Sequence, residues 1–307
     1  MQIRRLLFAC SLVVTLSATD DTIADDWPMY GRDKTHNAVS PELNPPTDWD
    51  VGKFDSKTGD WVGSRNILWS APLGSISFGD PVVADGQVWI GTNNYSRSDY
   101  KTKNDASVLA GFDVRNGRSL FQYFSLRLTD RIHDFTTSPL SCSPLIEGDL
   151  MWFTTNRCET VCLDLAPLKR GEQQPREVWK VDMMNQFGVY PIRASMRWFH
   201  SCSISSDQNR IFVITGNGFD YERKQIPAPE APSLICFDKY TGKELWQDNS
   251  PGENILLGQW SSPLVSTRIV SHYFELPGFV ADETVTVHSQ EDGNEHKLHL
   301  YNIPLHR

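Results

Sequence analysis

The sequence lacks any apolar stretch long enough to span a membrane. The apolar run near its start, residues 6–16, is broken by Ser11 and Thr15, whereas a membrane-spanning helix needs about 20 apolar residues. An excess of positive charge is also missing, because 29 Lys and Arg stand against 38 Asp and Glu and give a net charge of -9. Nucleic-acid binding relies on Lys and Arg to neutralise phosphates. We therefore expect no transmembrane segment and no nucleic-acid partner.

Cysteine motifs of the metal-binding kinds are also absent. No Cys-x-x-Cys pair occurs among the 6 cysteines, so zinc-ribbon and c-type haem sites lack their usual ligand spacing. No calcium loop of the Asp-x-Asp-x-Asp-Gly type occurs either. No metal site is expected from these patterns. The cysteines that follow the first two dozen residues are Cys142, Cys158, Cys162, Cys202 and Cys236.

Residues 1–24 have the pattern of a secretory signal peptide. Arg4 and Arg5 form a positive start, the apolar run follows, and small residues stand at Ala18 and Ala24. Cleavage after Ala24 would give a mature chain that starts at Asp25, and cleavage after Ala18 is the alternative. We expect a periplasmic or secreted protein.

One pattern is repeated three times, with a period of roughly sixty residues. The copies occupy approximately residues 76–125, 140–182 and 200–248, and a fourth copy starts at residue 258. Each copy holds four short apolar segments of strand length, and in the first two copies an Asp-Gly or Glu-Gly turn follows the first segment. Repeated units of four antiparallel strands are the blades of a propeller. The sequence therefore predicts an all-β fold, a β-propeller over residues 25–266 with about three blades and a fragment.

The turns of these copies resemble a known repeat. Residues 237–246, which read Phe-Asp-Lys-Tyr-Thr-Gly-Lys-Glu-Leu-Trp, resemble the signature of the pyrroloquinoline-quinone (PQQ) repeat, in which Asp and Thr-Gly precede a docking Trp. Phe121 stands where the first copy should have this Trp. Residues 68–74 resemble an isolated fourth strand, which in the family closes the ring by joining the last blade. Residues 26–33 resemble the opening of exported quinoprotein-like propellers.

The resemblance implies two functions of different classes. The first is a binding or scaffold module, as in the outer-membrane β-barrel assembly lipoprotein, with a protein partner or small ligand at the propeller loops. The second is a PQQ-dependent oxidoreductase that acts on an alcohol or sugar and holds the quinone over calcium. The adjacent cysteines that often lie beside the quinone in that family are missing here, and no motif assigns a catalytic Asp. The binding module is therefore favoured, and an absorption spectrum after addition of PQQ and calcium would separate the two.

A polar and aromatic group precedes the third and fourth copies and could face the channel mouth. A cation beside an aromatic ring suits an anionic or planar ligand. The alternative interpretation is that the Trp side chains pack between blades and the Arg side chains are solvated. The candidates are Arg193, Arg197, Trp198, His200 and Trp260.

Asp113, Asp164 and Asp238 recur at one place in each copy. Regularly spaced carboxylates could bind metal, but Asp side chains commonly accept bonds from backbone N–H groups two or three residues later. We expect these residues to cap turns.

The repeat pattern stops after Ser266. Residues 267–307 contain neither Thr-Gly nor Trp, so we expect a non-repeat tail and an incomplete propeller, because a closed ring typically needs about four to eight blades. A truncated or frameshifted reading frame is the favoured explanation. Two alternatives stay open: assembly of partial rings into an oligomer, or a divergent closing blade built from residues 284–288 and 297–301.

Overall fold

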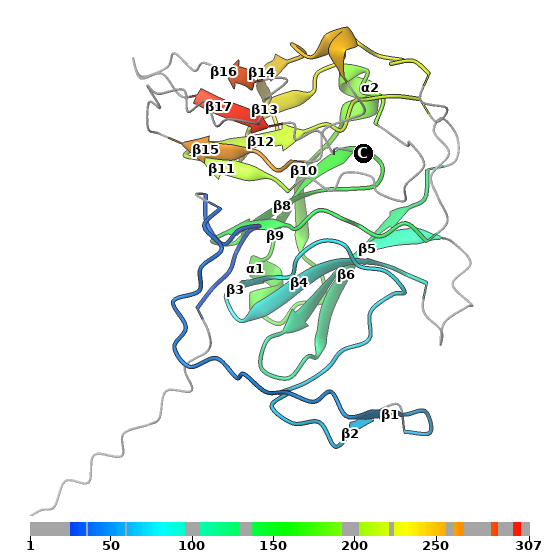
Figure 1. Cartoon of the computed structure of the whole chain (residues 1–307), viewed down its shortest axis with the longest axis vertical. Coiled ribbons are helices and arrows are strands. Elements are labelled where there is room, and N and C mark those ends of the chain that lie inside the picture. Colours follow the sequence, from blue (N-terminus) through cyan, green and yellow to red (C-terminus); the bar gives the residue numbers. More distant parts are fainter. Residues whose placement is uncertain are drawn as a thin grey trace, which may run out of the picture.

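Figure 1 shows a computed structural model of the chain, which describes residues 25–34, 36–58, 60–95, 105–128, 137–191, 203–220, 224–255, 261–266, 284–287 and 297–301. Strands are much more frequent than helices in these ranges, and all strand pairs are antiparallel. The helical elements are short: α1 (Ala166–Lys169), α2 (Met183–Phe187) and the 3-10 helix η1 (Gly252–Asn254). Within the described ranges, no helix has the length and hydropathy to cross a bilayer.

Three four-stranded sheets form the body of the molecule, and each is a meander in which neighbours in sequence pair. Blade 1 contains β3 (Val82–Ala84), β4 (Gln87–Asn93), β5 (Ala106–Asp113) and β6 (Ser119–Leu126). Blade 2 contains β7 (Leu145–Glu147), β8 (Leu150–Thr154), β9 (Glu159–Asp164) and β10 (Arg176–Asp182). Blade 3 contains β11 (Ser205–Asp207), β12 (Arg210–Ile214), β13 (Leu234–Asp238) and β14 (Glu244–Asp248). The predicted all-β propeller architecture is confirmed.

The blades stack face to face and bury their apolar side chains between them. One core cluster joins Trp89 and Leu109 of blade 1 to Phe153 of blade 2. A second cluster joins Trp152 of blade 2 to Phe237 of blade 3. A single four-stranded sheet cannot bury both faces alone, so this stacking supplies the core. Figure 1 shows the resulting row, with blade 1 below blade 2 and blade 3 above them.

Turn chemistry explains why each blade folds locally. Asp85 and Gly86 connect β3 to β4 with φ values of 48° and 74°, which is the left-handed pair that a two-residue hairpin turn needs. Between β13 and β14, the Asp238 N–H donates to the carbonyl of Lys243 at 2.8 Å, and Gly242 adopts a φ of 68°. These turns set the strand register.

The docking tryptophan Trp179 holds blade 2 against blade 3. Its indole N–H donates to the carbonyl of Lys239 at 3.0 Å, in the turn between β13 and β14. Its ring lies over Gly242, where a Cβ would come within 2.7 Å of the ring if the residue were not glycine. The glycine is therefore required both by its positive φ and by the close approach of the indole.

Trp69 makes the same contact with blade 1 from outside the three sheets. Its indole N–H donates to the carbonyl of Val114 at 2.6 Å, and its ring covers Gly117. Trp246 is the equivalent residue of blade 3, and its indole N–H is buried with no acceptor among the described residues. Two of the three equivalent indoles thus bond to the turn of the next blade, and the third does not.

The interface between blades 1 and 2 lacks the indole-to-turn hydrogen bond that joins blades 2 and 3, and residues of both blades explain why. Phe121 replaces the docking Trp on β6, and the turn it faces carries α1 in place of a Thr-Gly turn. Phe121 packs against a core cluster that contains Leu165 and Leu168. An apolar ring without an N–H suits a helical turn that offers leucine side chains.

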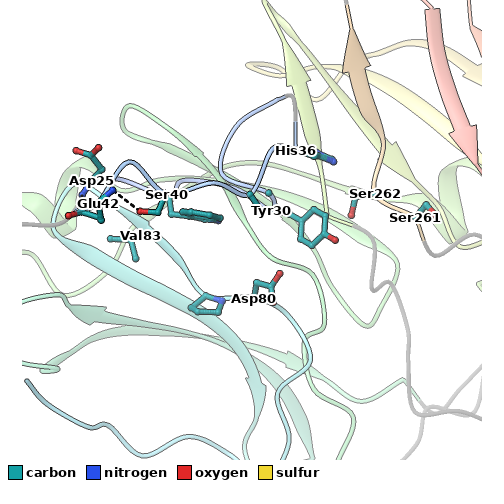
Figure 2. A pocket seen from close by; sticks show the side chains of 13 residues that line it. Asp25, Tyr30, His36, Ser40, Glu42, Asp80, Val83, Ser261 and Ser262 are labelled. Atoms are coloured by element: carbon teal, nitrogen blue, oxygen red, sulfur yellow. Dashed lines mark hydrogen bonds between the residues drawn. The ribbon is translucent and has the colours of Figure 1, made fainter. Parts of the chain in front are cut away.

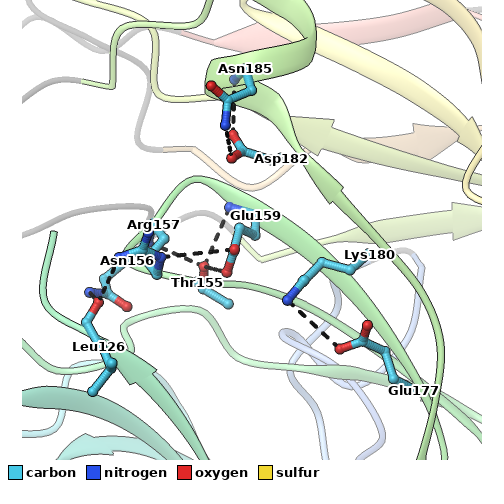
Figure 3. A network of polar contacts seen from close by, with 9 residues as sticks. All are labelled: Leu126, Thr155, Asn156, Arg157, Glu159, Glu177, Lys180, Asp182 and Asn185. Atoms are coloured by element: carbon cyan, nitrogen blue, oxygen red, sulfur yellow. Dashed lines mark hydrogen bonds and ion pairs between the residues drawn. The ribbon is translucent and has the colours of Figure 1, made fainter. Parts of the chain in front are cut away.

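A polar network also ties these two blades together (Figure 3). The side chains of Asn156 and Arg157 both donate to the carbonyl of Leu126 at the end of β6, at 3.3 and 3.4 Å. The neighbouring Thr155 hydroxyl bonds to the Glu159 carboxylate at 3.1 Å. The end of β6 is thereby fixed to the β8–β9 connection.

A two-stranded hairpin, β1 (Lys53–Asp55) with β2 (Asp60–Val62), projects from the body at the blade 1 end (Figure 1). Its aromatic residues are exposed, with Phe54 at 56% and Trp61 at 44%, and their rings lie 5.6 Å apart. We call residues 49–62 the aromatic arm. Trp49, at its start, is 63% exposed.

A fourth sheet follows blade 3 and departs from the blade pattern. It contains β15 (Leu264–Ser266), β16 (Thr284–Val287) and β17 (Lys297–Tyr301) in the order β15-β17-β16. The last two strands fall on the residues that the closing-blade alternative names. The order is not sequential, whereas blades 1 to 3 are sequential meanders, so the division of the chain after Ser266 stays a prediction.

Candidate binding site on the inner strands

The segment at residues 25–42, which we call the strap, crosses the first strands of all three blades. Trp27 pairs with Val83 of β3 through two backbone hydrogen bonds of 2.7 and 2.9 Å. The carbonyl of Pro28 then accepts the N–H of Ile146 on β7 at 2.8 Å. The strap therefore runs along the edge of the blades that their first strands form.

Two further side chains, those of Met29 and His36, fix the strap to the blades. Met29 is buried in the cluster between blades 2 and 3. The His36 Nε2 lies 3.3 Å from the hydroxyl of Ser205 on β11. Within ten residues, this segment contacts all three blades and bridges their first strands.

A pocket of about 920 Å³ opens between the strap and the segments that lead into the first strands (Figure 2). Figure 2 shows the side chains of Tyr30, Asp80 and Ser262 around it. The strap contributes Asp25, Trp27, Tyr30, Gly31, His36, Ala38, Ser40 and Glu42, and the blades contribute Asp80, Pro81, Val83, Ser261 and Ser262. We call it the strap pocket.

The blade residues of the pocket occupy equivalent places in the repeat. Asp80 and Ser262 each stand just before the Pro that leads into a first strand, and so do the equivalent Ser143 and, without the Pro, Ser203. The Ser143 N–H donates to the Ser203 hydroxyl at 3.2 Å, and the Ser203 N–H donates to the Ser262 hydroxyl at 2.9 Å. This chain of bonds runs from blade to blade and positions the pocket wall.

The contacts of His36 indicate which of its ring nitrogens carries a hydrogen and how burial affects its pKa. The Ser205 hydroxyl donates its only proton to the carbonyl of Pro263, so the bond to His36 requires Nε2 to carry the hydrogen. Burial lowers the pKa of the imidazole below its ordinary 6.5, and the charge of Asp33 opposes this effect. The ring also meets Tyr30 edge-on, with centroids 5.4 Å apart.

The charge of the lining is negative. Asp25, Glu42 and Asp80 supply carboxylates, and none of the lining residues is Lys or Arg. The backbone N–H of Asp25 donates to the Glu42 carboxylate at 2.7 Å. Carboxylates near the rings of Trp27 and Tyr30 favour a ligand that carries positive charge, by Coulomb attraction and by cation–π contact.

The channel-mouth candidates of the sequence cannot be compared with the strap pocket. Arg193, Arg197, Trp198, His200 and Trp260 all fall outside the described residues, so their channel-mouth role stays a prediction. Trp260 directly precedes Ser261 of the pocket wall. Sequence reasoning missed Tyr30, His36 and Asp80 as pocket residues, although the resemblance at residues 26–33 marked part of the strap.

The turn-capping prediction is confirmed for all three repeated aspartates. Asp113 and Asp164 each accept the backbone N–H two residues later, both at 2.9 Å. Asp238 accepts the N–H groups two and three residues later at 3.1 and 2.9 Å. Across the described ranges, no group of three or more His, Cys, Asp or Glu side chains is placed to hold a metal ion.

Four cysteines can be placed, and all are buried free thiols: Cys142, Cys158, Cys162 and Cys236. Cys162 and Cys236 lie on the third strands β9 and β13, the equivalent positions that the repeat predicts. Cys202 lies outside the described residues. Burial raises the pKa of Cys162 to about 12, which makes its thiolate scarce at neutral pH.

The strap pocket does not fit PQQ. The quinone carries carboxylate groups, and the pocket lining contributes three carboxylates and no Lys or Arg. Like charges held close together repel, so this lining disfavours the quinone. A quinone and calcium site therefore stays an expectation from the resemblance, and the strap pocket is not its place.

Comparisons with known proteins report a likeness in structure only. No protein-family model matches the sequence, and no curated protein matches it. The chain is similar to a quinohemoprotein alcohol dehydrogenase from Comamonas testosteroni, with 14% identity and a TM-score of 0.48, over 78% of this chain and 33% of that one. It is similar to the quinohemoprotein alcohol dehydrogenase ADHIIG from Pseudomonas putida HK5, with 13% identity and a TM-score of 0.41, over 72% and 26%.

A third similar structure is BamB from Moraxella catarrhalis, with 16% identity and a TM-score of 0.34, over 59% of this chain and 39% of that one. The chain thus spans between 26% and 39% of the length of these three proteins. At such identities the likeness concerns the propeller fold alone. The resemblance to PQQ-type propellers is confirmed at that level.

Proposed function

We propose that this protein is an exported PQQ-like propeller that acts as a binding module, and that the strap pocket takes a small ligand bearing an ammonium or guanidinium group. The observation that carries the proposal is the pocket itself. It is large enough for a small molecule, its lining has three carboxylates and no Lys or Arg, and two aromatic rings border it. These groups are those that recognise an organic cation.

Export is part of this proposal and is supported by the Arg4-Arg5 start and the apolar run at residues 6–16. Cleavage after Ala24 would convert the backbone N–H of Asp25 into an α-ammonium group 2.7 Å from the Glu42 carboxylate. A charged donor would strengthen that bond. The carboxylate of Asp80 would then dominate the field that a cationic ligand meets.

Calorimetric titration with agmatine, a dication, tests the binding function. We expect Asp80→Asn to weaken agmatine binding by roughly two- to fivefold, which is the loss of one partly exposed ion pair. Added salt should weaken binding to the unaltered protein, because exposed charges are screened.

Glu172→Gln is the matched control, because Glu172 is an exposed carboxylate outside the pocket lining that pairs with Arg170. Its affinity for agmatine should stay unchanged. Succinate, a dianion, should not bind. Equal affinity for agmatine in both variants, or binding of succinate at the same site, contradicts the proposal.

A further inference from the structure

Residues 68–74 lie against blade 1 as the fourth strand of a neighbouring blade would, but no described strand pairs with them. Trp69, Ala71 and Leu73 pack against the outer face of blade 1. Leu68 points away and is 81% exposed. The docking bond of Trp69 to Val114 repeats the contact that β10 makes with blade 3. The segment therefore sits as a fourth strand does, but no backbone hydrogen bond joins residues 68–74 to any described strand.

Hydrogen bonds in the three blades reveal which edge of a fourth strand faces the third strand. In each blade one backbone hydrogen bond joins the fourth-strand side to the residue just before the third strand, and it is made by Arg127, Met183 or Asp248. These residues lie six, four and two positions after the docking residues, which are Phe121, Trp179 and Trp246. All three separations are even, and alternate peptide groups of a strand point to one edge. The peptide group of the docking residue therefore faces the third strand.

The same rule assigns the edges of residues 68–74. The peptide groups of Trp69, Ala71 and Leu73 face the place of a third strand, and those of Ser70 and Pro72 face outward. Pro72 has no N–H, and on the outward edge none is needed, because proline in a sheet is confined to such edges. The segment thus has the pattern of a strand that pairs along one edge.

The fourth sheet has three described strands and, within the described ranges, lacks the strand that would flank β16 in a blade. Because β17 pairs antiparallel with both β15 and β16, those two strands run in the same direction, as the first and third strands of a blade do. Val265 of β15 joins an apolar cluster with Phe212 and Trp246 of blade 3. The sheet therefore stacks where the next blade belongs. No fourth strand flanks β16 among the described residues.

One copy of the chain does not bring these two parts together. Residues 68–74 pack on blade 1, the fourth sheet packs on blade 3, and blade 2 separates them. Figure 1 shows the fourth sheet at one end of the row of sheets and the aromatic arm, which precedes residues 68–74, at the other.

We propose that two copies of this chain join into one closed ring of eight sheets, in which residues 68–74 of each copy pair with β16 of the other. Two identical contacts related by a two-fold axis close such a ring, and about eight blades lies within the range of known propellers. The exposed rings of the aromatic arm, Trp49, Phe54 and Trp61, lie beside this junction in sequence and supply apolar surface for the second copy to cover.

Sedimentation equilibrium of the full mature chain tests the proposal, with two proline variants that differ only in the edge they alter. We expect the unaltered protein to have twice the mass of one chain at micromolar concentration. Ala71→Pro removes an N–H that faces the partner strand and should raise the dimer dissociation constant by about tenfold or more. Ser70→Pro removes an outward N–H and should leave the dimer intact.

Hydrogen exchange of the unaltered protein supplies a measurement that does not depend on any variant. The amides of Ala71 and Leu73 should be protected at high concentration and exchange faster on dilution, while the amide of Ser70 stays fast throughout. A single-chain mass at all concentrations, as further blades in a longer chain would also produce, overturns the proposal. So does an equal effect of the two proline variants on the dimer, or fast exchange of Ala71 at high concentration.

Discussion

Burial of His36 against Ser205 makes the stability of the strap depend on pH. The folded-state pKa is lowered from 6.5, and loss of hydration by burial is the main cause. Below pH 6.5 the unfolded chain binds this proton more readily than the folded protein, so the free energy of unfolding falls as the pH falls through 6.5 toward the folded pKa. Above about pH 7.5 the imidazole is neutral in both states and this contribution is complete.

Urea unfolding of the unaltered protein and of His36→Gln at pH 7.5, 6.5 and 5.5 measures this dependence. Gln retains an N–H donor for the Ser205 hydroxyl but does not titrate. We expect the loss of stability between pH 7.5 and 5.5 to be smaller in His36→Gln, because the remaining loss comes from other groups. The same loss in both proteins contradicts the assignment.

Individual side chains could be predicted from the sequence where their partner is close in the chain. Asp113 and Asp238 cap turns two or three residues away, so the repeat alone indicated their role. The strap pocket escaped prediction because it brings Tyr30 and His36 together with Ser262, more than two hundred residues later. No local pattern encodes such a contact.

The contact between the Trp179 ring and the turn of blade 3 predicts that an Ala substitution destabilises the protein more at Gly242 than at Gly148. Gly242 and Gly148 both have positive φ, 68° and 59°. A Cβ at Gly242 would lie 2.7 Å from the Trp179 ring, whereas a Cβ at Gly148 would meet nothing within 4 Å. Both Ala substitutions incur about 1–2 kcal/mol of left-handed strain, and Gly242→Ala must also displace the docking indole.

We expect Gly242→Ala to lower the free energy of unfolding by about 3–5 kcal/mol, and Gly148→Ala by about 1–2 kcal/mol. Thermal and urea unfolding followed by circular dichroism measure both. In a Trp179→Ala background the excess effect of Gly242→Ala should disappear, because the ring it displaces is gone. An excess that persists in that background would assign the cost to the backbone alone.

At the level of elements, the blades were predictable because their turns and apolar segments are adjacent in sequence. The exceptions lie where a change in one blade matches a change in the blade that faces it. Phe121 departs from the docking Trp of the repeat because the facing blade has α1 where a Thr-Gly turn would otherwise stand. The order β15-β17-β16 could not be predicted, because β15 pairs with β17 and not with the next strand in sequence.

For the whole molecule, the strap is the element that links all three blades, and Met29 is its buried anchor. Met29 is 5% exposed and packs with residues of blades 2 and 3. The backbone bonds of Trp27 and Pro28 on one side, and the His36 contact on the other, depend on its position. Truncation of this side chain should therefore loosen contacts to several blades at once.

We expect Met29→Ala to lower the free energy of unfolding by about 2–4 kcal/mol, the range for a fully buried methionine. Met184→Ala is the control, because Met184 is only half-buried against the same cluster, and it should cost about half as much. Hydrogen exchange supplies the second measurement: in Met29→Ala the amides of Val83 and Ile146, which bond to the strap in blades 1 and 2, should both exchange faster. If Met29→Ala costs no more than Met184→Ala, or if only the blade that directly surrounds the side chain loses protection, the blades hold one another without the strap, and the strap serves the pocket alone.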